Sequence, residues 1–447
     1  MRFILFWAFI GISLIIIMRS PFWGVVIYSC MNIIRPELLF WGGKCYSIDS
    51  MKVIFFAIII GIIIHRKETS WCNIYQKELF LLYLLYAGTI VSNLLSQYNL
   101  PHQYYYANEL LIVAFFCSFV CLLVNSQVKI ASYQNYLLLF VVILASWGID
   151  QHFRGNDRLE LLGGYDSNGA AAFFVLFAPL AFHKYVVAKT RRGKSAWAAA
   201  SISIVLAIIF SQSRGGLLGL IAATLVYILF SKKKVQVLIV AFMISLIAWP
   251  FLADTYTERI MGTMTSEEKL DWSAESRLYL WQAGLMIFRD NPFFGTGLLS
   301  YPIEKFKYED HFSYLDPEFR AWLFRGNDPK VTHNTYIKFL SDCGLAAGAP
   351  YVLLIIGTFL ANRKVRQRMN AGELCDKKMM ALLIAVECGI WGNCVSNFFI
   401  DANFEIFLYI QIICCAIMRG LLYDNKRLSS SKSGKTIFVG QLDANTF

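Results

Sequence analysis

Long apolar segments recur along almost the whole chain, and they limit the folds that it can adopt. Hydrophobic residues make up 57% of the sequence and charged residues only 16%, whereas soluble domains carry about 25% charged residues. Each segment approaches the roughly 20 residues that an α-helix needs to cross the hydrocarbon core of a bilayer. The sequence therefore predicts an all-α polytopic integral membrane protein.

The apolar segments predict about 12 transmembrane helices. The candidate spans are 3–18, 21–34, 51–65, 79–96, 109–124, 136–150, 169–188, 196–213, 215–231, 235–252, 334–361, 379–399 and 404–420. The second span is short and ends at Arg35 and Pro36, so that either 12 or 13 crossings are expected and the side of the N-terminus stays open. The first span has no small-residue cleavage site and is expected to remain in the membrane.

Basic residues gather in short clusters beside the apolar segments and give the expected orientation. The clusters are Lys189–Lys194, Lys232–Lys234, Arg363–Arg368 and the C-terminal tail. The positive-inside rule places such clusters in the cytoplasm, which accounts for the net charge of +11 without a nucleic-acid partner. The connections 35–50, 97–108, 151–168 and 253–333 are then expected on the outer side.

This orientation divides the chain into four parts. Residues 1–252 are expected to form an N-terminal transmembrane bundle of nine or ten helices, and 253–333 a large, partly helical outer loop. Residues 334–420 are expected to form the C-terminal transmembrane helices and 421–447 a disordered cytoplasmic tail. Connections as long as the outer loop are usually functional, so we expect the function on the outer side.

One amphipathic helix is predicted inside the outer loop, near 274–290. Ser273 can cap its start and Asn291-Pro292 ends it. Leu278, Trp281, Leu285 and Phe288 follow a helical spacing that places them in one apolar stripe. The helix is expected either to lie on the membrane surface or to pack against the bundle.

Three polar side chains are expected to meet at the outer membrane surface. Arg214 lies between two apolar spans, where a guanidinium inside the bilayer would cost at least several kcal/mol, so its segment is expected to be the junction of two helices. Arg277 starts the loop helix, where the helix dipole favours anions. His333 stands where the chain re-enters the membrane. Two permanent cations beside a titratable base are typical of phosphate chemistry with a general base.

Cysteine and histidine residues are not spaced as metal ligands. The eleven cysteines lie mostly within apolar spans, and no two of the six histidines are spaced as a ligand pair. The sequence predicts neither a metal site nor another cofactor.

Sequence blocks in a fixed order carry a resemblance to a known family. They are SQSRGGLLGL (211–220), SRLYLWQAGLMIFRDNPFFGTGLLSY (276–301) and HNTYIKFLSDCGLAAG (333–348), preceded by GGYDSNGAAAFFVLFAP (163–179). With the expected topology they resemble the O-antigen ligase/polymerase superfamily of bacterial membrane enzymes that use polyprenyl-linked glycans. The segment RSPFWGVVIYSCMNIIRPELLFWG (19–42) resembles O-glycosylation ligases associated with exosortase systems, which favours a ligase over a polymerase.

The resemblance implies an enzyme that transfers an O-antigen-like glycan from undecaprenyl pyrophosphate to an acceptor hydroxyl, such as one of lipid A-core. The implied reaction is inverting and independent of metal, and takes place at the periplasmic face of the bacterial inner membrane. His333 matches the family's general base, and Arg214 and Arg277 match the arginines that hold the pyrophosphate. A forked guanidinium suits phosphate oxygens. Membrane lipids are further expected partners, and the protein is expected to be a monomer or a weak dimer.

Other polar residues of the outer segments are secondary candidates. They are Arg154 and Arg158 for phosphate contacts, Asp166 and Asn168 for donor orientation or helix capping, Asn334 beside the histidine, and Arg320 and Arg325, for which a structural role is favoured. His311 is a competing base. Asp310 and Glu318 are acidic residues of the same loop that could assist His333.

Two other functions stay open at this point. A polymerase of the same superfamily would use a second lipid-linked repeat unit as its acceptor. A transporter for lipid-linked sugar is expected to show inverted repeats and charges near the bilayer midplane, whereas the charges here lie at the ends of the spans.

Overall fold

The computed structural model describes residues 2–35, 49–71, 76–98, 100–155, 159, 166–230, 272–325, 330–402 and 405–442, and the regular secondary structure within these ranges is helical. The helices are α1 (Arg2–Arg19), α2 (Phe22–Ile34), α3 (Ser50–Ile64), η2 (Arg66–Glu68), α4 (Lys77–Leu95), α5 (Pro101–Leu123), α6 (Gln127–Phe153), α7 (Ser167–Val187), α8 (Arg191–Phe210), α9 (Arg214–Phe230), α11 (Trp272–Asp290), α12 (Tyr301–Glu304), η4 (Lys305–Phe312), α13 (Pro317–Phe324), α14 (Thr335–Asn370), α15 (Lys377–Ser396) and α16 (Ile406–Leu442).

Eight described helices are long and apolar enough to cross a membrane, namely α4 to α8 and α14 to α16. The shorter apolar helices α1, α2, α3 and α9 coincide with four further predicted spans. An all-helical, multi-pass membrane protein is therefore confirmed. The total of 12 crossings stays a prediction, because the predicted span 235–252 lies outside the described residues.

Polar side chains mark the starts of several helices. The Asp49 carboxylate accepts hydrogen bonds from Met51 N and Lys52 N at the start of α3. The Ser126 hydroxyl accepts one from Lys129 N, and Asp376 caps α15 in the same way. These caps satisfy N–H groups that have no partner within the helix. They also explain why α6 begins nine residues before the predicted span (127 against 136), since polar residues extend the helix beyond its apolar part.

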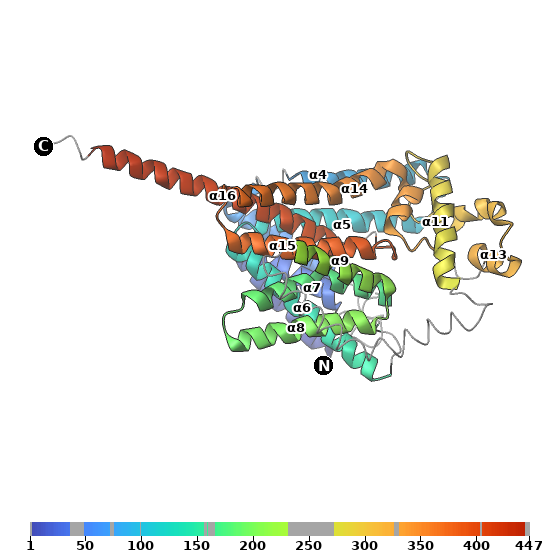
Figure 1. Ribbon diagram of the computed structural model, residues 1–447, viewed down its shortest axis with the longest axis horizontal. Helices are drawn as coiled ribbons and strands as arrows, with labels where there is room; N and C mark the ends of the chain where they lie inside the picture. Colours follow the sequence, from blue (N-terminus) through green and yellow to red (C-terminus); the bar gives the residue numbers. More distant parts are fainter. Residues whose placement is uncertain are drawn as a thin grey trace.

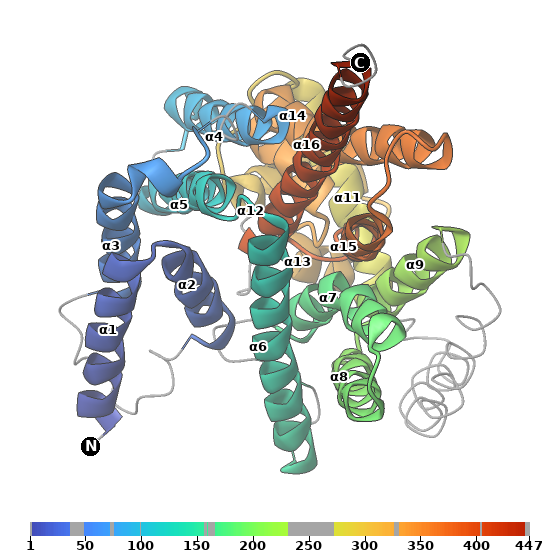
Figure 2. The same cartoon turned by 90° about the vertical axis from the view of Figure 1, so that its left-hand side faces the viewer.

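Most helices run along the long axis of the molecule, whereas α11 crosses them at one end (Figure 1). Helices α12, η4 and α13 lie on the far side of α11, and the α7–α8 connection and the C-terminus lie at the opposite end of the bundle. Viewed along the bundle, α1, α2 and α3 form a group at one side, and α7, α8 and α9 form another (Figure 2). The molecule thus has two distinct ends, which we call the α11 end and the C-terminal end.

Small residues allow α7, α9 and α15 to pack closely. A Cβ atom on Gly219 of α9 would lie 2.6 Å from the carbonyl oxygen of Gly392 in α15, and one on Gly392 would lie 2.6 Å from Val175 of α7. Close backbone approach at small residues is the usual way in which transmembrane helices associate. This contact fixes α9, which begins with Arg214, against the centre of the bundle.

Helix α14 is broken near its start and is repaired by a turn from the outer loop. Gly344 has φ 59° and ψ −154°, a conformation that essentially only glycine adopts. Beyond the break, Leu345 N donates to Pro292 O and Ala346 N to Phe293 O, both at 2.9 Å, while Gly297 N donates to Asp342 O at 2.7 Å. The turn that follows α11 is therefore built into α14.

Two helices extend beyond their predicted spans. The basic residues 363–368 lie within the last turns of α14, directly after its apolar part. Helix α16 continues to Leu442; no proline interrupts the chain between Gly420 and Leu442, so the backbone can continue in helical form. The basic cluster Lys232–Lys234 lies outside the described residues.

Candidate active site

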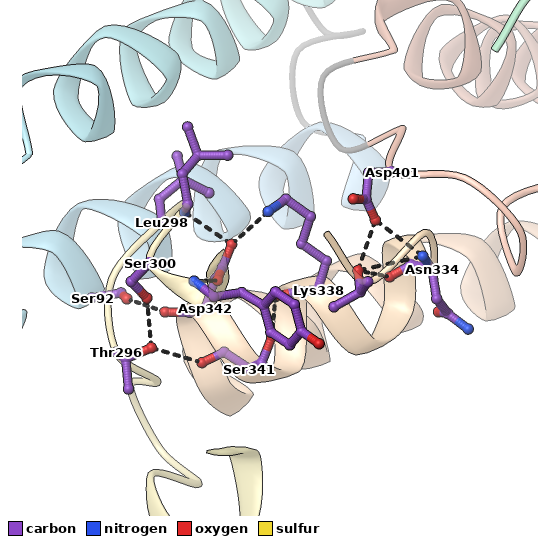
Figure 3. A network of polar contacts seen from close by, with 12 residues as sticks. Ser92, Thr296, Leu298, Ser300, Asn334, Lys338, Ser341, Asp342 and Asp401 are labelled. Atoms are coloured by element: carbon purple, nitrogen blue, oxygen red, sulfur yellow. Dashed lines mark hydrogen bonds and ion pairs between the residues drawn. The ribbon is translucent and has the colours of Figure 1, made fainter. Parts of the chain in front are cut away.

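His333 lies in the short connection before α14, and the residues on either side of it, Thr332 and Asn334, are both hydrogen-bonded to Asp401. The Thr332 hydroxyl donates to Asp401 Oδ1 at 2.8 Å, and Asn334 N donates to the same oxygen at 3.0 Å (Figure 3). The Asn334 side chain accepts from Tyr336 N and Ile337 N, both at 3.0 Å, and so caps α14. Asn334, a secondary candidate of the sequence, therefore holds the helix start.

The His333 backbone adopts a left-handed conformation with φ 47°. Such a conformation costs a non-glycine residue about 1 kcal/mol or more and persists only where the surroundings impose it. Here the hydrogen bonds of Thr332 and Asn334 to Asp401 impose it. The connection thus presents a half-buried imidazole at a fixed position in front of the helix.

Asp401 is a site residue that the sequence analysis missed. It lies between α15 and α16, and its Oδ2 atom is buried without a hydrogen-bond partner in the described part of the chain. Its carboxylate acts electrostatically on the His333 imidazole. Asp310 and Glu318, the acidic residues considered from the sequence, are exposed side chains of η4 and α13.

Arg277 lies in the first turns of α11, beside the histidine connection. Trp281, one turn further along, donates from Nε1 to the carbonyl oxygen of Thr332 at 2.9 Å. Gly284 follows on the same helix, and a Cβ atom there would lie 2.5 Å from Ile337 in α14. The half-buried Arg277 acts electrostatically on His333. The structure therefore brings these two predicted site residues together.

The predicted apolar stripe of α11 lies partly on the surface of the protein. Leu278 and Leu285 are 62% and 49% exposed. The buried face is formed instead by Leu280, Ala283 and Ile287, which pack against Tyr301 and Phe312 of the outer loop and against further apolar residues of η4 and α13. The sequence predicts helix α11, but it does not show that η4 and α13 pack against a different face of α11 from the one that carries the stripe.

Arg214 is exposed at the first position of α9, immediately after a tight turn from α8. The junction of two helices predicted from the sequence is thus confirmed. Gln212 in this turn has φ 53°, and the Ser213 hydroxyl accepts from Gly216 N at 3.1 Å to cap α9. A Cβ atom on Gly215 would lie 2.7 Å from Phe399, whose ring centroid is 6.4 Å from that of Trp281. Phe399 therefore connects the helix that carries Arg214 with the helix that carries Arg277.

The start of α7 borders the same region. Asp166 Oδ1 accepts from Gly169 N at 2.7 Å, so this carboxylate caps α7, and it also acts electrostatically on His333. Asn168 lies in the same first turn. The N-terminal ends of α7, α9 and α14 thus lie at the α11 end, where their helix dipoles favour an anion.

The pKa of His333 lies below its usual value. Burial is the main cause, because it disfavours the charged imidazolium, and the positive charges of Arg277 and Lys330 lower the pKa further. Asp401 and Asp166 oppose them with negative charge. The imidazole is therefore neutral at neutral pH and able to accept a proton, with carboxylates nearby to stabilise the imidazolium that results.

The other predicted arginines that the structure describes form ion pairs of their own. Both Arg320 and Arg325 pair with Glu309, with their Nε atoms 3.6 Å and 2.7 Å from its carboxylate. Arg154 pairs with Asp150 at the end of α6, at 2.7 Å. Arg158 lies outside the described residues.

His311, the competing base of the sequence, lies on η4 of the outer loop and not in the His333 connection. It is exposed in η4, with its ring centroid 6.0 Å from that of Tyr308. Within the described ranges, no group of three or more His, Cys, Asp or Glu residues is arranged to hold a metal ion.

A comparison with protein families gives one match. Residues 199–352 match the family model of O-antigen ligase. The matched part extends from α8 into α14 and contains Arg214, Arg277 and His333. No curated protein matches the chain. Residues 199–352 are therefore similar to the O-antigen ligase family, in agreement with the resemblance found in the motifs.

Proposed function

We propose that the protein is a glycan ligase that transfers an O-antigen-like glycan from undecaprenyl pyrophosphate to the hydroxyl of an acceptor such as lipid A-core. The observation that carries this proposal is the position of a neutral, half-buried His333 beside Arg277. Asp401 accepts a hydrogen bond from the neighbouring Asn334 N and so supports the connection that carries the histidine. The family match supports a ligase or polymerase reaction, and a base and two arginines at the proposed site suit such a reaction.

In the proposed reaction, His333 accepts the proton of the acceptor hydroxyl. The acceptor oxygen forms a bond to the anomeric carbon of the sugar, and the bond from that carbon to the diphosphate oxygen breaks on the opposite face with inversion. Arg214, Arg277 and the nearby helix N-termini receive the charge of the polyprenyl diphosphate that leaves. The family resemblance implies that no metal is needed, so the guanidinium groups take the part that a divalent cation plays in other enzymes.

We further propose that the α11 end faces the periplasm and the C-terminal end the cytoplasm of a bacterial inner membrane. The arrangement of basic residues supports this orientation, because the α7–α8 connection with Lys189–Lys194 and the last turns of α14 lie at the C-terminal end. The site would then meet lipid-linked glycans after their transfer across the membrane.

A reconstituted reaction with purified protein, a lipid-linked glycan and candidate acceptors tests the function. A ligase produces acceptors that carry one transferred chain each, with release of polyprenyl diphosphate. Growing lipid-linked chains in the absence of another acceptor would instead establish a polymerase. If neither product forms while lipid-linked sugar crosses the membrane of proteoliposomes, the protein is a transporter and the proposal fails.

The pH dependence of kcat/KM should reveal how neighbouring charges change the pKa of His333. Since the neutral imidazole is the active form, activity rises with pH through the His333 pKa, and this acid limb should lie below about pH 6.5. Asp401→Asn removes a charge that raises this pKa, so the limb should move to lower pH. Arg277→Gln removes a charge that lowers it, so the limb of the residual activity should move to higher pH. Shifts in the same direction would contradict this assignment.

A further inference from the structure

A buried ion pair lies in the first turns of α14, just beyond the candidate site. Lys338 Nζ donates to Asp342 Oδ2 at 2.9 Å, and the two residues are only 4% and 0% exposed (Figure 3). Removing two charges from water is costly unless other hydrogen bonds compensate for it. The partners of this pair therefore indicate what it holds in place.

Asp342 binds the backbone of the outer loop. Its Oδ2 atom accepts from Leu299 N at 2.9 Å, and its Oδ1 atom accepts from Tyr301 N at 3.0 Å. Leu299 has φ 62°, a left-handed conformation that costs a leucine about 1 kcal/mol or more. The carboxylate thus fixes a turn that the backbone of Leu299 does not favour by itself.

The same turn reaches α11 through one side chain. The fully buried Tyr301 donates from its hydroxyl to the carbonyl oxygen of Leu280 in α11 at 2.8 Å. Leu280 is three residues after Arg277 and directly precedes Trp281, which donates to Thr332. A continuous path of hydrogen bonds therefore runs from Lys338 and Asp342 to the helix that carries Arg277.

The ammonium end of the pair is also close to the His333 support. Asp401 acts electrostatically on Lys338 as well as on His333. Lys338 follows Asn334 by one helical turn, and Asn334 N is one of the two donors to Asp401. The ion pair thus lies between the connection that carries His333 and α11, which carries Arg277. The proposed reaction requires a fixed arrangement of these two parts.

We propose that Lys338 and Asp342 are positioning residues, whose ion pair fixes the turn at Leu299–Tyr301 and, through it, the place of Arg277 beside His333. The kinetic consequence rests on the proposed function, whereas the coupling of the pair to α11 does not. Neither side chain is assigned a contact with substrate.

Three variants of the purified full-length protein test the pair: Lys338→Met, Asp342→Asn and the double variant. We expect each single variant to lower kcat by about 10- to 10²-fold, because small misplacements of reacting groups have effects of this size, while KM for the lipid-linked donor changes by less than about twofold. Hydrogen–deuterium exchange should become faster in peptides that cover 276–303. Asp342→Asn gives the Leu299 and Tyr301 amides a neutral acceptor, and Lys338→Met removes the counter-ion of the buried Asp342 carboxylate, which then favours its protonated form and accepts more weakly.

The double variant distinguishes two causes of a loss of activity. One is the loss of the ion pair that positions the turn, and the other is the destabilisation caused by a single buried charge without a partner. Removing both charges should restore thermal stability towards that of the wild type, while kcat stays low and exchange of 276–303 stays fast. Full recovery of kcat and exchange in the double variant would overturn the inference. The control is the ion pair of the half-buried Arg366 in α14 with the buried Glu387 in α15: Arg366→Met/Glu387→Gln should leave both measurements for the folded protein unchanged.

The exchange measurement also keeps the two proposals apart. If exchange of 276–303 in Lys338→Met equals that of the wild type, the positioning inference fails whatever the kinetics show. If exchange changes as expected but His333→Ala retains full activity, the proposed chemistry fails and the structural coupling stands.

Discussion

Replacing His333 by alanine is expected to lower kcat for glycan transfer by about 10²- to 10⁴-fold, the usual contribution of a general base. The half-buried imidazole has a lowered pKa and interacts electrostatically with Arg277 and with the carboxylate of Asp401. Alanine removes the only proposed proton acceptor but leaves the backbone hydrogen bond from Asn334 to Asp401 in place. The measurement is the initial rate of acceptor glycosylation by purified protein, with thermal unfolding recorded in parallel.

His311→Ala is the matched control for this variant. His311 lies in the same outer loop but is exposed in η4, next to Tyr308. Its replacement should leave kcat within about twofold of the wild type, as is usual for a surface residue away from the chemistry. A wild-type rate for His333→Ala, or an equal loss for His311→Ala, would show that His333 is not the base.

Replacing Arg277 by alanine is expected to reduce kcat by about 10²- to 10³-fold, since it removes a donor to the charge that develops on the leaving diphosphate. Arg277→Lys should recover only part of this loss, because an ammonium is a point charge and does not bind two phosphate oxygens in the manner of the guanidinium fork. Arg214→Lys should show a loss of the same kind. Steady-state kinetics with the lipid-linked donor distinguish an effect on kcat from one on KM.

Arg289→Lys provides the control on the same helix. Arg289 is exposed near the end of α11 and pairs with Asp290, with Nε 3.1 Å from its carboxylate. The substitution keeps the charge at a surface position, so kcat should stay within about twofold of the wild type. If Arg277→Lys is as active as Arg289→Lys, Arg277 does not bind the pyrophosphate through its fork.

Much of the fold follows from hydrophobicity alone. Each predicted span within the described residues corresponds to a helix, because a segment of about 20 apolar residues has few other ways to satisfy its backbone. The boundaries are less predictable: α5 begins at Pro101 and α6 ends at Phe153, both beyond the apolar parts. Polar caps and helix-forming residues extend helices past the membrane core, and hydropathy does not register them.

The candidate site was predictable in part. Arg214, Arg277 and His333 follow from charges at the ends of spans together with the family motifs, and Asp401 could have been found by the same reasoning. It is an acidic residue in the connection between the last two spans, which the predicted orientation places on the same side as His333. Asp310 and Glu318 of the large loop lie on the same predicted side, and the sequence does not distinguish the three carboxylates from one another.

Lys338 and Asp342 could not have been identified in this way. Their spacing of four residues is common on exposed helix faces, where such pairs contribute little. Their importance depends on burial and on the Leu299 and Tyr301 amides, which reach Asp342 only because the outer loop folds back onto α14. Long-range contacts of this kind leave no periodic pattern in a single sequence.

The break in α14 has a consequence for how the protein tolerates different bilayers. Helices accommodate a thicker or thinner hydrocarbon core mainly by tilting, and a continuous α14 would transmit such a tilt directly to His333. At Gly344 the hydrogen bonds of the helix are replaced by bonds to the turn at Pro292 and Phe293. A change in the tilt of α14 beyond Gly344 is therefore expected to act on the turn that follows α11, through Leu345 and Ala346, rather than along a continuous helix on His333.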